Sequence, residues 1–160
     1  MKKRMLYWMF AVACMVTGWS TSAVAADKVR GNIGIGVGQG TTVGLGLSGK
    51  LYMGDSFAIQ PVLGISDNRI GLSVDALLEM PALFNSGPIE IAWALGLGPG
   101  VAVGSDNFAL GIAGVAGLEF NFSVIPSLPF DLVVEYRPSF FIIPVDLNLV
   151  SFSGHLRVYF

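Results

Sequence analysis

Large apolar residues alternate with small or polar residues through most of this 160-residue chain. In the segment 89–97 every odd position is large and apolar, and every even position is alanine, glycine or glutamate. Because successive side chains of a β-strand point to opposite faces, this two-residue period predicts strands rather than helices. We therefore expect an all-β protein whose strands are apolar on one face.

Eight segments follow this pattern, and turn-forming Gly, Asn, Asp and Pro residues separate them. They lie at 32–38, 42–53, 57–66, 70–79, 89–98, 108–123, 130–137 and 150–160. The large apolar residues of the last segment fall at even positions, whereas those just before it, at 145, 147 and 149, fall at odd positions. This change predicts a bulge or strand break near residues 149–150. A strand of about ten residues can cross a bilayer when it is tilted. Length and number of segments together favour an even-stranded membrane barrel.

The first 26 residues have the features of a secretory signal peptide. Basic residues at positions 2–4 precede a short apolar run, and small residues follow it. Cleavage after Ala25 or Ala26 would leave residues 27–160 as one β-barrel domain. It would also remove Cys14, the only cysteine, so neither a disulfide nor a cysteine metal site is expected.

The face opposite the large apolar residues consists mainly of Gly, Ala and Ser. Only 12% of all residues are charged, about half the share of a typical soluble domain. Lipid would suit the apolar face, and small side chains would suit the narrow interior of an eight-stranded barrel. We therefore expect a closed, antiparallel, up-and-down transmembrane β-barrel. A soluble periplasmic β-barrel that binds apolar ligands, with the same face turned inward, is an alternative.

The chain resembles the small eight-stranded outer-membrane barrels of Gram-negative bacteria, such as the transmembrane domain of outer membrane protein A. The resemblance rests on the signal peptide, the eight segments and the C-terminal stretch 156–160. In that stretch Leu156, Val158 and Phe160 look like the aromatic-ended signal that the barrel-assembly machinery reads. The resemblance implies location in the cell outer membrane, contact with its lipids and periplasmic termini. The short connections depart from the long extracellular loops that are usual in that class.

With this orientation, the inward face has a charged part, mostly toward the periplasmic end, and a small-residue part in the outer half. Buried charges are tolerated when they are paired, so we expect a lumen charge network. Its predicted members are Lys50, Asp75, Glu79, Glu90, Glu119, Asp131, Glu135, Arg137 and Arg157. The outer half is either packed or leaves a cavity for an acyl chain or a small apolar ligand. The candidate lining residues are Gly36, Gly44, Gly46, Gly71, Ser73, Gly96, Gly98 and Gly111.

Signals for catalysis are weak. The period-2 glycines at 34–38 and 96–100 lack the helix that follows a nucleotide-binding loop. His155, close to Ser151 and Ser153, invites comparison with lipid-modifying barrel enzymes that use Ser, His and Glu, but the sequence places no third group beside it. We expect no catalytic residue, cofactor, metal or nucleic-acid partner, and no open pore, because eight strands leave no continuous channel.

The expected function is therefore that of a monomeric outer-membrane barrel with a structural or small apolar-ligand-binding role. A lipid-modifying barrel enzyme, either an acyl hydrolase or an acyltransferase, and the soluble periplasmic barrel are the alternatives.

Overall fold

The computed structural model describes residues 32–66, 68–86, 88–105, 108–122 and 129–160. The predicted signal peptide, residues 1–26, lies outside these ranges. The described chain forms β1 (Ile33–Gly40), β2 (Val43–Tyr52), β3 (Phe57–Ser66), β4 (Arg69–Asn85), β5 (Ile89–Gly104), β6 (Phe108–Phe122), β7 (Phe130–Tyr136), β8 (Ser139–Ile143), β9 (Val145–Asn148) and β10 (Phe152–Tyr159). No helix in this part of the chain is long and apolar enough to cross a membrane.

These strands close into an eight-stranded antiparallel β-barrel. Each of β1 to β5 pairs with the next strand in the chain, β6 pairs with β7, β7 pairs with β10, and β10 pairs with β1 to close the barrel. β8 continues the line of β7 along β6, and β9 pairs with β8, so β7–β8 and β9–β10 serve as the last two strands. The predicted all-β closed barrel is confirmed, and so is the strand break near residues 149–150.

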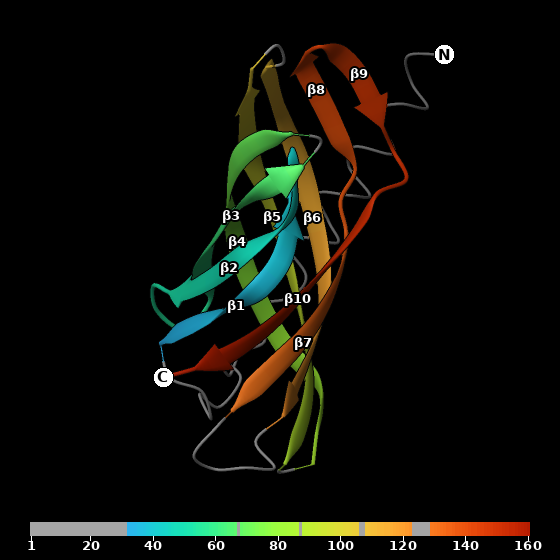
Figure 1. Cartoon of the computed structure of the whole chain (residues 1–160). Coiled ribbons are helices and arrows are strands. Elements are labelled where there is room, and N and C mark those ends of the chain that lie inside the picture. Colours follow the sequence, from blue (N-terminus) through green and yellow to red (C-terminus); the bar gives the residue numbers. More distant parts are fainter. Residues whose placement is uncertain (1–31, 67, 87, 106–107, 123–128) are drawn as a thin grey trace, which may run out of the picture.

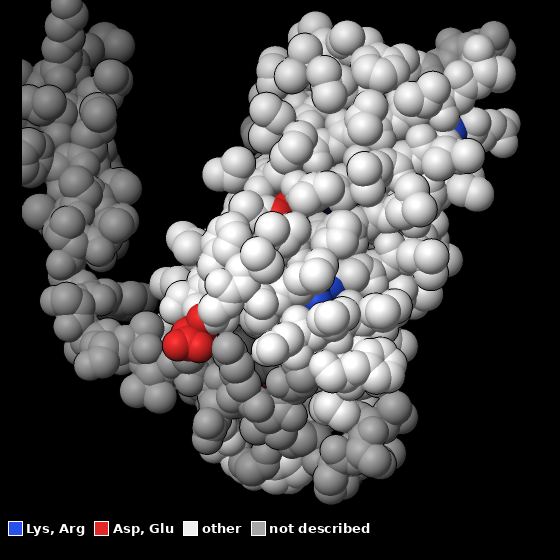
Figure 2. All heavy atoms as spheres, turned by 90° about the vertical axis from the view of Figure 1, so that its left-hand side faces the viewer, with Lys and Arg blue, Asp and Glu red and all other residues white. Residues whose placement is uncertain are grey.

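The distribution of residues is the inverse of that in a soluble barrel. Even-numbered residues on β5 such as Ala92 and Ala94 are buried, whereas the outward-facing Leu97 is 63% exposed. The same inversion holds around the barrel, where large apolar side chains form most of the outer surface. Figure 2 shows one side of the molecule, on which charged atoms appear at only a few points.

The turn between β1 and β2 folds into the barrel. A Cβ atom added to Gly100 of β5, which lies across the barrel from β1, would be 2.2 Å from the carbonyl oxygen of Thr41. Only a residue without a side chain permits this approach. Val43 follows the turn inward and is 5% exposed, although its parity predicts an outward position. A register shift between Gly38 and Gly40 on β1 accompanies the change.

The two ends of the barrel differ in construction. The last strand β10 ends beside the start of β1, and the β8–β9 hairpin stands at the opposite end, which we call the mouth (Figure 1). The β1–β2 turn also points toward the mouth but stops short of it, because β1 has only 8 residues whereas β5 has 16. The inward turn therefore forms a floor below the mouth.

Candidate functional site

The barrel interior contains the nine charged residues that strand parity predicts there. Eight of them are almost completely buried: Lys50, Asp75, Glu90, Glu119, Asp131, Glu135, Arg137 and Arg157. The ninth, Glu79, is partly exposed and makes an ion pair with Lys50, with 2.8 Å between Oε1 and Nζ. Buried charges cost several kcal/mol each unless they are paired, so their partners determine whether this interior is stable.

Two basic residues organise the terminal end of the lumen, which is the end opposite the mouth, where β1 begins and β10 ends. Lys50 pairs with Glu79 and also with Glu119, whose Oε1 accepts a hydrogen bond from the ammonium group. Arg157 pairs with Asp131 at 2.8 Å between Nη2 and Oδ2. Both basic side chains are fully buried, and each has a carboxylate within direct contact. The interior at this end therefore holds ion pairs beside a small apolar cluster of Ala58, Leu77, Ala94 and Val115.

Arg137 organises the half nearer the mouth. Its Nη2 donates to Asp75 Oδ1 at 2.9 Å, and its Nη1 donates to Glu135 Oε2 at 2.7 Å. The same Nη2 donates to Thr41 Oγ1 at 2.8 Å, which holds the inward β1–β2 turn against the opposite wall. A single guanidinium thus contacts two carboxylates and anchors the turn.

Gln60 connects the two halves, and sequence reasoning did not select it. Its side-chain oxygen accepts from Arg157 Nη1 at 2.6 Å, and its nitrogen donates to Glu135 Oε1 at 2.9 Å. Asn121 is a second uncharged member, donating to Glu90 Oε1 at 2.9 Å. The position of each residue on the inward face of its strand was the available signal. Charge indicates the members of an ion-pair network, whereas the amides that link these members carry no charge.

His155 stands between a hydroxyl and a carboxylate. Its Nδ1 is 2.9 Å from Ser48 Oγ, and its Nε2 is 3.1 Å from Glu135 Oε2. A serine, a histidine and an acid in this order resemble the groups of nucleophilic hydrolases. Ser48 is only 1% exposed, however, and it lines neither of the two cavities described below. The neighbouring Ser153 donates to Glu135 instead of contacting the histidine.

Most of the small residues predicted to line an outer cavity lie at close approaches between strands. A Cβ on Gly36 would be 1.9 Å from the backbone oxygen of Leu156, and one on Gly46 would be 2.4 Å from the Cα of Gly64. Gly71, Gly96, Gly98 and Gly111 are likewise positions where an added Cβ would meet neighbouring atoms at 3.0 Å or less. Ser73 is buried beneath Gly40. Within the described chain, these residues therefore let the strands and the inward turn pack closely.

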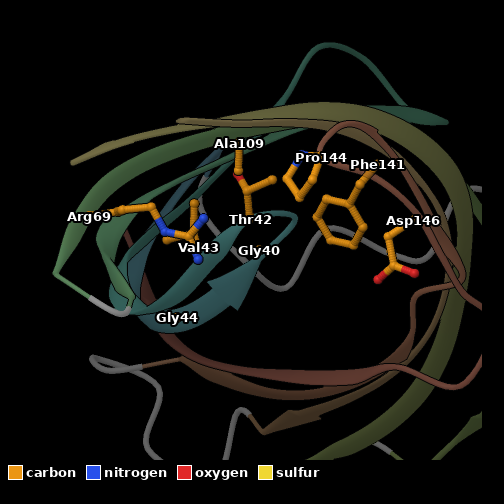
Figure 3. Close-up of a pocket in the computed structure, with 9 residues that line it drawn as sticks. All are labelled: Gly40, Thr42, Val43, Gly44, Arg69, Ala109, Phe141, Pro144 and Asp146. Atoms are coloured by element: carbon orange, nitrogen blue, oxygen red, sulfur yellow. The ribbon is translucent and has the colours of Figure 1, made fainter. Parts of the chain in front are cut away.

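The mouth of the barrel holds a cavity of about 340 Å³, which we call the mouth cavity (Figure 3). Its lining comes from the β1–β2 turn, the starts of β4 and β6, and the β8–β9 hairpin. The lining residues are Gly40, Thr42, Val43, Gly44, Arg69, Ala109, Phe141, Pro144 and Asp146. Gly44 is the member of the predicted lining set that reaches this cavity. The volume lies at the lower end of the range for small-molecule sites.

A second hollow, of about 500 Å³, lies over β1 to β4. Leu45, Leu47 and Leu63 are among its lining residues. Gly46 and Gly64, at which β2 and β3 approach closely, also line it. Its lining is almost entirely apolar, as is the surface around it. This hollow has no charged residue with which to select a ligand.

A scan against protein-family models and searches of curated proteins and of solved structures found no match to this chain. Among the described residues, no group of three or more His, Cys, Asp or Glu side chains is placed to hold a metal ion.

Proposed function

We propose that this chain is an integral β-barrel protein of the outer membrane of a Gram-negative bacterium, with a structural or small-ligand-binding role. The inverted distribution of side chains carries the proposal. Lys50, Asp75 and Arg157 are completely buried, while Leu45 and Leu97 on the outer surface are more than 60% exposed. Charged groups are almost never placed inside, with large apolar groups outside, when water is the solvent. Lipid around the barrel would explain both.

The interior network supports a barrel that does not conduct. Arg137 bridges to Asp75 and to the inward turn, and Arg157 reaches Gln60 from the other end. These contacts cross the lumen at successive levels, and small eight-stranded barrels have interiors that side chains can fill. The proposed role is therefore that of a sealed barrel, not a pore.

The C-terminal strand supports the proposed route of assembly. Leu156 and Phe160 of the predicted assembly signal are exposed on the outer face, and Val158 between them is partly exposed. An outward row of this kind at the end of β10 is accessible to the barrel-assembly machinery. In the membrane the same residues would contact lipid. We propose a monomer, because closure of the barrel pairs β1 with β10 within one chain.

Dependence on detergent tests the proposal. The exported chain is expected to stay folded and monomeric in detergent micelles, to migrate faster on a gel when unheated than when boiled, and to precipitate when detergent is removed. The physical reason is its exposed apolar outer surface, which water cannot solvate. A chain that remains a folded monomer after complete removal of detergent and lipid would contradict the proposal and favour a soluble barrel.

A further inference from the structure

The mouth cavity carries opposite charges on opposite sides. Figure 3 shows Arg69, at the start of β4, on one side and Asp146, on β9, on the other. Val43, Phe141 and Pro144 lie between them and supply an apolar middle. The sequence distance between Arg69 and Asp146 means that only the closed barrel brings them to one cavity. A ligand that satisfied all three parts would need an anionic group, a cationic group and an apolar portion between them.

Thr42 gives a second, independent indication of a binding site. Its φ is +62°, in the left-handed region that β-branched residues rarely adopt. Its Oγ1 is inaccessible to solvent and has no hydrogen-bond partner among the described residues. Strained residues are found preferentially at sites where ligands are held. Thr42 also lines the cavity, so the strained turn occurs together with the two charges, while the enclosed hydroxyl is not itself a contact for a ligand.

We propose that the mouth cavity binds a small zwitterion. Its anionic group would contact Arg69, its ammonium group Asp146, and its apolar part Phe141. A free short peptide and a lipid headgroup bearing phosphoethanolamine share this chemistry. The inference deepens the ligand-binding part of the proposed function and replaces a purely apolar ligand by an amphipathic one. It does not depend on insertion of the barrel into a membrane.

Matched ligands and variants test the proposal by calorimetric titration of the exported chain in detergent. The dipeptide Ala-Phe is expected to bind, and blocking either its amino group by acetylation or its carboxylate by amidation should weaken binding about tenfold. Arg69→Gln should weaken binding of Ala-Phe by a similar factor but leave binding of the amidated form unchanged. Asp146→Asn should weaken binding of Ala-Phe but not of the acetylated form. Asp55→Asn, in the turn before β3, is the control and should have no effect.

Thr42→Gly tests whether the strained turn belongs to the site. Glycine tolerates the positive φ but leaves the turn freer to move, so the variant should fold at least as stably as the parent while binding Ala-Phe more weakly. Unchanged affinity would show that the strained turn has no part in binding and would contradict its place in the site. The gel mobility of each unheated variant reports its folding in the same samples.

Phosphoethanolamine distinguishes the two sources of the ligand. Tighter binding of phosphoethanolamine than of Ala-Phe would indicate a lipid headgroup, and the reverse order would indicate a peptide. The proposal is overturned if neither probe binds the folded chain, or if Arg69→Gln and Asp146→Asn leave both affinities unchanged. Neither result would affect the dependence on detergent, so failure of this inference is distinguishable from failure of the proposed function.

Discussion

Arg137→Ala is expected to lower the free energy of unfolding of the barrel by about 3–5 kcal/mol. The side chain is 2% exposed and donates to Asp75, Glu135 and Thr41. Its removal leaves Asp75 without its guanidinium partner and releases the β1–β2 turn. Urea unfolding of the barrel in lipid vesicles, followed by the fluorescence of Trp93, would measure the loss.

Arg69→Ala is the control, because it removes the same side chain from the rim of the barrel. Its expected cost is about 1 kcal/mol or less, as for other partly exposed charges. Arg137→Ala should also cost less in a chain that already carries Asp75→Ala, since neighbours in one network are coupled by about 0.5–3 kcal/mol. Equal losses at positions 137 and 69 would contradict the assignment of Arg137 as the organiser of the lumen.

Leu97→Arg is expected to cost about 2–4 kcal/mol in lipid vesicles, whereas Val103→Arg should cost about 0–1 kcal/mol. Both residues lie on the outward face of β5, and their exposed fractions are similar, 63% and 57%. They differ in position along the strand, because Leu97 is near its middle and Val103 is near the mouth. The cost of a charge on a lipid-facing surface falls from the bilayer centre to its edge. The same urea titration would measure both variants.

A soluble barrel would respond differently to this pair. In water, arginine at either exposed position would change stability by about 0.5 kcal/mol or less, since neither residue is packed in a core. Two small and equal effects would therefore contradict a lipid-facing surface. A large effect at position 97 alone would support it.

The sequence was sufficient to predict the barrel and the side of the wall on which most residues lie. Alternation is a local property of each strand, so the inward position of Glu90 and the outward position of Leu97 follow from parity alone. The change of parity before Val150 also predicted the break between β9 and β10. Eight alternating segments then left closure as the simplest way to satisfy the strand edges.

The contacts within the lumen were not predictable, because they depend on residues far apart in the chain. Ser48 meets His155 across 107 positions, and Thr41 meets Arg137 across 96. Parity failed at Val43, where the inward turn shifts the register and reverses the direction of the side chain. Sequence reasoning also could not show that the small residues of the interior would be used for close strand packing.

Contact of the outer face with lipid is the central claim of the proposed function, and Trp93 can report this contact directly. It is the only tryptophan in residues 27–160, and it lies on the odd-numbered, outward face of β5. The chain would be incorporated into vesicles whose lipids carry bromine on their acyl chains, which quench a tryptophan that contacts them. Strong quenching relative to vesicles of unbrominated lipid is the expected result. Fluorescence of a folded chain that is equal in the two kinds of vesicle would contradict it.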